Sequence, residues 1–235
     1  MGIIKTKGLI ISENKMGDYD KMVTILTPSG KIGCAAKGAR RPKSLLMAGT
    51  QFFCFGEYMI FKGTNSYNIN SCDTIEIFYN LRTDLDKLNC AVELCKIVDK
   101  VTYENQNTYK ILQLLLNTLY VISETDKDLE LVKSIFKMRL LCILGFMPKI
   151  DKCVNCDEVD KISYFSIADN GFKCINCGKV DKSAISIGAT TVDAIRFIVK
   201  APAKKIFSFN LPEESLKELA LISKIYLNEK LELEQ

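Results

Sequence analysis

The chain has 235 residues, with 48% hydrophobic and 26% charged side chains, an ordinary balance for a globular protein with a buried core. Its apolar runs fall short of the roughly 18 consecutive residues that a membrane-spanning helix needs, so we expect no membrane segment. The formal net charge of +4 belongs entirely to residues 1–80, because acids and bases balance over the remainder. The sequence carries no recognisable targeting or lipidation motif, and a cytoplasmic protein is therefore expected.

The first third of the chain alternates short apolar runs with turn residues, a pattern typical of β-strands. Pro28-Ser29-Gly30 predicts a tight hairpin turn between the second and third strands. Five strands with no helix between them favour a small closed barrel such as an OB-fold over residues 1–80. The expected strands are Thr6–Ser12, Met22–Thr27, Ile32–Lys37, Phe52–Phe61 and Ser66–Ile77.

A short cationic stretch lies between the third and fourth expected strands. The segment from Lys31 to Lys43 carries five positive charges and no acid. Such a run is most often solvated surface. This one also contains glycine and proline, and residues 38–51 predict a flexible loop that interrupts the barrel.

After residue 80 the apolar spacing changes to three and four, which predicts helices in a second domain over residues 81–235. Gly145 and Pro148 are expected to end the third helix. Thr190 and Asp193 predict a capping box at the start of the fourth. The expected helices lie around Ala91–Val101 and over Tyr109–Ile122, Leu129–Leu144, from about Thr190 onward, and Pro212–Glu232.

Two Cys-x-x-Cys pairs interrupt this helical region, within a segment expected to run over residues 151–182. Cys153 and Cys156 are separated from Cys174 and Cys177 by residues 157–173, a spacing typical of four-thiolate zinc sites. Two such turns complete a tetrahedron with Zn–S distances of about 2.3 Å. Four protein ligands leave no open position, so the zinc is expected to be structural.

Other interpretations of the four cysteines are less favoured. Disulfides suit secreted proteins, whereas six further cysteines in mostly apolar runs indicate a reducing compartment. A four-thiolate iron site is not excluded by the sequence. A thioredoxin-like redox pair is disfavoured, because neither pair is expected to open a helix after a strand.

The sequence lacks the elements of common active sites. It contains no histidine, which removes Ser-His-Asp and Cys-His catalysis. The stretch Gly33–Gly38 resembles the start of a P-loop, but Ala39 and Arg40 stand where Lys and Ser/Thr are required. Asp18 and Asp20 are interpreted as a solvated pair. We therefore expect no enzyme.

Several segments resemble the RecO family of bacterial recombination mediators. The resemblance covers most of residues 1–178, and the last helices match it only in position and character. Asp18 keeps a carboxylate where the family often has Glu. The matching segments are Gly8-Leu-Ile-Ile-Ser, Gly17-Asp-Tyr-Asp20, Val23-Thr-Ile-Leu-Thr27, Gly30-Lys-Ile, Ala36-Lys-Gly-Ala-Arg-Arg-Pro-Lys-Ser44, and Lys137-Met-Arg-Leu-Leu-Cys-Ile-Leu-Gly-Phe-Met-Pro148 before the first cysteine pair.

The resemblance implies an OB-fold followed by a helical domain with zinc, and a non-enzymatic role in gap repair. Proteins of this family bind single- and double-stranded DNA and anneal complementary strands coated with single-strand-binding protein. With RecR they help to load RecA, and the acidic tail of single-strand-binding protein is a ligand of the helical domain. A bacterial, nucleoid-associated protein is thus implied.

The family's basic stretch corresponds to Lys37, Arg40, Arg41 and Lys43, which the resemblance implies as phosphate contacts, with Gly38 and Pro42 shaping the loop. Weaker cationic candidates are Lys5, Lys7, Lys21, Lys31 and Lys62. The aromatic residues Phe52, Phe53, Phe55, Tyr58 and Phe61 suit base stacking, but core packing is the favoured role for each of them.

Two other functions fit the sequence. The chain could be an RNA-binding or ribosome-associated protein with the same OB-fold and zinc segment, which a preference for structured RNA would indicate. It could also be an adaptor whose helical domain binds proteins and whose cationic stretch is ordinary surface.

Overall fold

The computed structural model describes residues 2–64 and 66–232. The chain divides into two compact units, Met1–Glu124 and Thr125–Gln235. The domain boundary expected near residue 80 differs from this division and stays a prediction. Residues 1, 65 and 233–235 of the expected domains lie outside the described residues.

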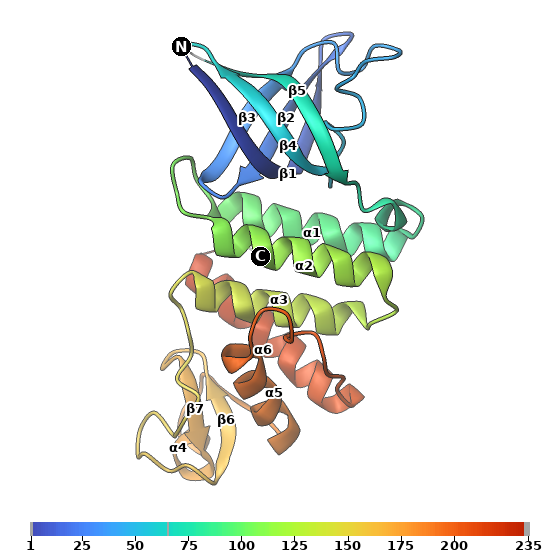
Figure 1. Cartoon of the computed structure of the whole chain (residues 1–235). Helices are drawn as coiled ribbons and strands as arrows, with labels where there is room; N and C mark the ends of the chain where they lie inside the picture. Colours follow the sequence, from blue (N-terminus) through green and yellow to red (C-terminus); the bar gives the residue numbers. More distant parts are fainter. Residues whose placement is uncertain (1, 65, 233–235) are drawn as a thin grey trace. The chain divides into compact units, whose positions relative to one another are not determined.

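Five strands of the first unit close into a barrel in the order β1-β2-β3-β5-β4 (Figure 1). Strand β1 pairs antiparallel with both β2 and β4, and β3 pairs parallel with β5. This is the five-stranded architecture of an OB-fold, so the fold predicted for this region is confirmed. The strands are β1 (Gly2–Met16), β2 (Asp20–Thr27), β3 (Gly30–Ala36), β4 (Phe55–Lys62) and β5 (Tyr67–Glu76).

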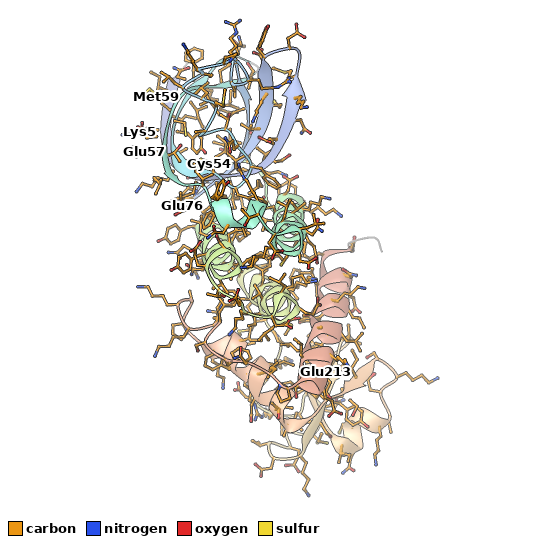
Figure 2. All side chains as sticks on the ribbon, turned by 90° about the vertical axis from the view of Figure 1, so that its right-hand side faces the viewer. Lys5, Cys54, Glu57, Met59, Glu76 and Glu213 are labelled. Carbon is orange, nitrogen blue, oxygen red and sulfur yellow. The ribbon has the colours of Figure 1, made fainter. Side chains whose placement is uncertain are left out.

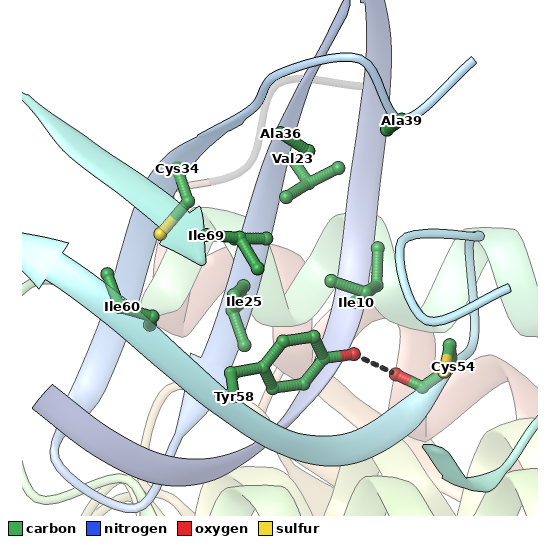
Figure 3. Close-up of a cluster of buried hydrophobic side chains, with 10 residues drawn as sticks. All are labelled: Ile10, Val23, Ile25, Cys34, Ala36, Ala39, Cys54, Tyr58, Ile60 and Ile69. Atoms are coloured by element: carbon green, nitrogen blue, oxygen red, sulfur yellow. Dashed lines mark hydrogen bonds between the residues drawn. The ribbon is translucent and has the colours of Figure 1, made fainter. Parts of the chain in front are cut away.

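Inward-facing side chains of the strands fill the barrel, since successive residues of a strand point to opposite faces (Figure 3). Tyr58 is fully buried, and its hydroxyl donates to the carbonyl oxygens of Gly49 (2.8 Å) and Cys54 (3.2 Å). On the outer face, Lys5 of β1 forms an ion pair with Glu57 of β4 at 3.0 Å (Figure 2).

Two helices, α1 (Leu85–Val101) and α2 (Tyr109–Glu124), complete the first unit after a short 3-10 helix η1 (Tyr79–Arg82). The predicted Pro28-Ser29 hairpin turn is present, because Thr27 pairs with Gly30. The loop between α1 and α2 holds this turn. The Thr108 N–H donates to the Pro28 carbonyl (3.0 Å), and the Gly30 N–H donates to the Thr108 hydroxyl (3.0 Å).

The segment between β3 and β4, predicted as a flexible loop, is a series of hydrogen-bonded turns. Backbone bonds join Arg41 to Gly38 (3.0 Å), Ser44 to Arg41 (3.1 Å) and Cys54 to Gln51 (3.1 Å). Ala39 is fully buried in the barrel core. Glycine and proline suit such tight turns as readily as mobile ones, and the flexibility of the segment stays a prediction.

The second unit contains three longer helices, a small sheet and one short helix. Helices α3 (Leu129–Ile143), α5 (Ala189–Lys200) and α6 (Glu213–Leu231) form its helical part. Arg139 of α3 donates to the carbonyls of Ile198 (3.0 Å) and Val199 (2.6 Å), which satisfies the end of α5. The cysteine segment holds β6 (Ile162–Ser166), β7 (Gly171–Cys174), α4 (Ile175–Lys179) and β8 (Ala184–Ser186), with sheet order β7-β6-β8.

The capping box predicted at Thr190 and Asp193 is wrong. Gly188 is the N-cap residue of α5 and makes no side-chain cap bond. Glu218 of α6 takes this role, accepting from the Gly188 N–H (2.9 Å) and from the Thr191 hydroxyl. A carboxylate near a helix N-terminus is favoured by the helix dipole, and here it comes from another helix.

Candidate metal centre and nucleic-acid interface

The structure brings together the four cysteines of the two Cys-x-x-Cys pairs, Cys153, Cys156, Cys174 and Cys177. Their sulfur atoms all lie within 4.8 Å of one another. The Sγ atoms of Cys156 and Cys174 are 3.6 Å apart. A tetrahedral zinc site with Zn–S bonds of about 2.3 Å has sulfur–sulfur edges of about 3.8 Å. The donor set and its size therefore fit one tetrahedral metal ion.

Backbone N–H groups prepare two of these sulfurs for metal binding. Burial raises the pKa of Cys153, but N–H groups of Cys174, Asn155 and Cys156 outweigh it and lower the pKa to about 6. The Cys177 N–H is the main cause that lowers the pKa of Cys174. The thiolate is the metal-binding form of cysteine, so these N–H groups favour the ligand state.

The position of Cys174 and Cys177 differs from the expectation that neither pair opens a helix after a strand. Cys174 ends β7 and is the N-cap residue of α4, so the pair of Cys174 and Cys177 does open a helix after a strand. These elements are only four and five residues long, too short to be recognised from apolar spacing. The convergence of all four sulfurs still favours a metal site over an isolated dithiol.

A nearly buried lysine supports the cysteine segment. Lys173, at 4% exposure, forms ion pairs with Asp181 (2.7 Å) and Asp169 (2.5 Å). The Lys173 and Ser166 contacts lower the pKa of Asp181. This network ties β7 and β6 to the residues that follow α4, and so holds Cys174 and Cys177 in place.

The second candidate site is the cationic loop, defined as residues 37–43, which leaves β3 at the surface. Lys37, Arg41 and Lys43 are exposed, and Arg40 is half-buried. Gly38 has φ of +65°, a conformation that glycine adopts without strain, and Pro42 is exposed at the turn. The structure thus groups the four predicted phosphate contacts on one short, hydrogen-bonded turn.

No carboxylate of the described residues forms an ion pair with the four cations of the loop. The Arg40 guanidinium donates to the Gly17 carbonyl at 3.2 Å. The Arg41 guanidinium lies 5.3 Å from the centre of the Tyr19 ring, as in cation–π contacts. All four charges therefore remain available to an anion.

The chain between β1 and β2 orders the cationic loop through hydrogen bonds that were not predicted from the sequence. Asp20, interpreted as solvated, accepts from the Gly38 N–H at 2.7 Å. The Tyr19 carbonyl accepts from the Arg40 N–H at 2.8 Å. Counting outward from the Pro28-Ser29 turn along the β2-β3 pairing would have placed Asp20 beside Lys37.

We expect Asp20→Ala to loosen the cationic loop while leaving the barrel folded. It removes the acceptor of the Gly38 N–H, a loss of about 1 kcal/mol for a typical hydrogen bond. Limited trypsin digestion should then cut faster after Arg40 and Lys43, since Pro42 blocks cleavage after Arg41. The matched control is Asp20→Asn, which keeps a side-chain oxygen. Equal cleavage of wild type and Asp20→Ala would show that this bond does not order the loop.

Most of the weaker cationic candidates on the barrel already have a partner within the protein. Lys21 pairs with Glu13 (2.8 Å) and Lys31 with Asp99 (2.8 Å), while Lys62 lies over the Tyr67 ring at 5.6 Å. Among the aromatic candidates, Phe53 and Tyr58 are buried. The half-buried ones are Phe52, Phe55 and Phe61.

The fold and sites define a class: an OB-fold barrel with a cationic surface loop, followed by helices that carry a four-cysteine metal-binding cluster. The family model described as "Recombination protein O N terminal" matches residues 1–78, and "Recombination protein O C terminal" matches residues 82–235. The chain belongs to the RecO family of DNA repair proteins, which gives it a role in DNA repair.

Similar proteins named "DNA repair protein RecO" match along most of the chain. The protein of Acetivibrio thermocellus is 42% identical over 234 residues, covering 99% of this chain and 93% of that protein. The protein of Alkaliphilus metalliredigens is 34% identical over 206 residues, covering 87% and 84%. The protein of Bacillus subtilis is 30% identical over 229 residues, covering 97% and 89%.

Within the described part of the chain, helices are either too short or too polar to cross a bilayer.

Proposed function

We propose that the protein is a non-enzymatic recombination mediator that binds single- and double-stranded DNA and anneals complementary strands. Its partners are RecR and the tail of single-strand-binding protein, and through them it helps RecA to load at gaps. We assign its place of action to the nucleoid, in the bacterial cytoplasm. Membership of the RecO family supports this proposal.

The observation that carries the proposal is the cationic loop on an OB-fold barrel. Four positive charges that no carboxylate of the described residues neutralises suit the phosphate backbone, which dominates non-specific affinity for DNA. Such contacts leave the bases free. Annealing requires this combination, because the charges of two strands must be screened while their bases remain available for pairing.

The metal cluster has a structural role in this proposal. Four sulfurs leave no coordination position for substrate, and we assign zinc to the site, with iron as the alternative that metal analysis would reveal. In this proposal the metal contacts neither DNA nor a partner protein and only stabilises the fold.

Annealing of complementary single strands coated with single-strand-binding protein tests the proposal directly. We expect the wild type to anneal them rapidly and Arg40→Glu/Arg41→Glu to lose this activity. Circular dichroism should show that the variant is folded, because the loop is held by the Gly38 N–H on the Asp20 carboxylate and the Arg40 N–H on the Tyr19 carbonyl, which the substitutions leave in place. A folded, metal-loaded wild type that anneals nothing would point to the adaptor. Tighter binding to structured RNA than to single-stranded DNA would indicate the RNA-binding alternative.

A further inference from the structure

A pocket of about 660 Å³ lies next to the cationic loop, within the first unit. Arg40 belongs to the cationic loop and also lines the pocket. The other walls come from β1 and β2, from the turns before β4, and from η1 and α1. Its volume is in the range of small-ligand sites, roughly 300–1,000 Å³.

Phe52 and Met47 form an apolar surface in this pocket. The Phe52 ring stacks on Phe53, with centroids 4.0 Å apart and an interplanar angle of 16°. Phe53 has φ of +65°, a left-handed conformation that is strained for an aromatic residue. Successive side chains of an extended strand point to opposite faces. The unusual backbone at Phe53 is therefore what lets the two rings lie together, with Phe53 buried and Phe52 partly exposed above it.

Hydrogen bonds from β1 and from η1 fix the conformation of residues 51–54. The Phe53 N–H donates to the Ile10 carbonyl (3.0 Å), and the Ile10 N–H donates to the Cys54 carbonyl (2.9 Å). Arg82 donates to the Phe52 carbonyl (2.6 Å) and to the Gln51 side chain. The pocket wall is thus ordered without a ligand, and strained residues held in this way often mark binding sites.

The charges in the pocket favour an anion. Its acid, Glu13, is already paired with Lys21 at 2.8 Å. The guanidinium groups of Arg40 and Arg82 donate to uncharged oxygens, and no carboxylate of the described residues forms an ion pair with them. An occupant that combines a flat apolar face with a negative charge matches both the Phe52 ring and the two arginines.

We propose that this pocket holds one unpaired nucleotide of a DNA single strand, with its base stacked on Phe52 and its phosphate beside Arg40 and Arg82. The proposal rests on the proposed function, because it assumes that the strand follows the cationic loop. The pocket would add a preference for single-stranded over double-stranded DNA, which phosphate contacts of the loop alone do not give. The bases of a duplex are paired and stacked, so only a single strand offers a base to the pocket, and stacking on an aromatic side chain strengthens binding by about tenfold.

Two single strands with the same number of phosphates test this inference on the full-length, metal-loaded protein. One is an oligothymidylate of about 20 nucleotides, a length that exceeds the usual OB-fold site of roughly 4–16 nucleotides. The other has the same length and carries abasic sites throughout. Fluorescence anisotropy should show about tenfold tighter binding of the oligothymidylate by the wild type.

Phe52→Leu should remove this difference and leave the affinity for the abasic strand unchanged, because leucine keeps the apolar volume but lacks a flat face. The matched control is Phe61→Leu on β4, which lies outside the pocket and should keep the preference. Equal affinities of the wild type for both strands would overturn the base pocket and leave phosphate binding intact. Binding of neither strand would overturn the proposed function as well.

Discussion

Replacing Cys156 with serine is expected to abolish stoichiometric metal binding and to destabilise the unit Thr125–Gln235. Cys156 is exposed, so the exchange of sulfur for oxygen removes a ligand with little effect on packing. Structural zinc contributes about 10–16 kcal/mol to the folding of zinc-finger peptides, and losing one of four thiolates should cost at least about 3 kcal/mol here. That loss corresponds to a fall of roughly 10 °C in the melting temperature.

Elemental analysis and calorimetry on the purified full chain measure both effects. Elemental analysis of the wild type also distinguishes zinc from iron. The matched control is Cys142→Ser on α3, a half-buried cysteine outside the cluster, which should keep its metal and nearly all of its stability. A Cys156→Ser protein that lacks metal but melts like the wild type would contradict a structural role.

The elements that the sequence predicted are those with a long repeat or a fixed spacing. The five strands of the barrel are each seven residues or longer, and all five are present. The Cys-x-x-Cys spacing fixes the local turn at each pair, and the four sulfurs converge as predicted. In both cases the information lies within a short stretch of chain, so a single sequence is enough to show it.

The features that the sequence did not reveal depend on contacts between distant segments. Glu218 caps α5 although it lies 30 residues from Gly188 in the sequence. Arg82 donates to the Phe52 carbonyl although β4 and β5 separate the two residues in the sequence. The left-handed Phe53 reverses the direction of a side chain inside what the pattern predicted as strand. Propensity favours none of these three features: the first unit imposes those at Phe52 and Phe53, and the second unit imposes the cap from Glu218.

The candidate site shows the same division. Composition marked the cationic stretch from Lys31 to Lys43 and the family resemblance singled out its four loop cations, whereas the partners that orient them, Asp20 and Tyr19, come from the preceding hairpin. Only the strand register connects the two, and the register follows from the Pro28-Ser29 turn. The pocket needs the closed barrel and η1 together, so no sequence pattern could have indicated it.

Neutralising two cations of the loop, by Arg40→Gln/Arg41→Gln, is expected to weaken single-stranded DNA binding about 25-fold at 100 mM salt. On single strands the logarithm of affinity falls with the logarithm of salt concentration at a slope of about −0.7 for each phosphate contacted. Four contacts predict a slope of about −2.8 for the wild type, and two predict about −1.4 for the variant. Titrations between 50 and 200 mM salt should therefore show roughly 50-fold and 7-fold losses of affinity.

A control with the same change in net charge separates direct contact from the general field of the protein. Lys204→Gln/Lys205→Gln removes two neighbouring exposed cations after α5 and should leave the salt slope at its wild-type value. Because phosphate contacts carry no sequence information, the loop variant should weaken binding to mixed and homopolymeric strands alike. If the two variants change the slope equally, DNA senses only the overall charge, and the cationic loop is not the surface that holds the phosphates.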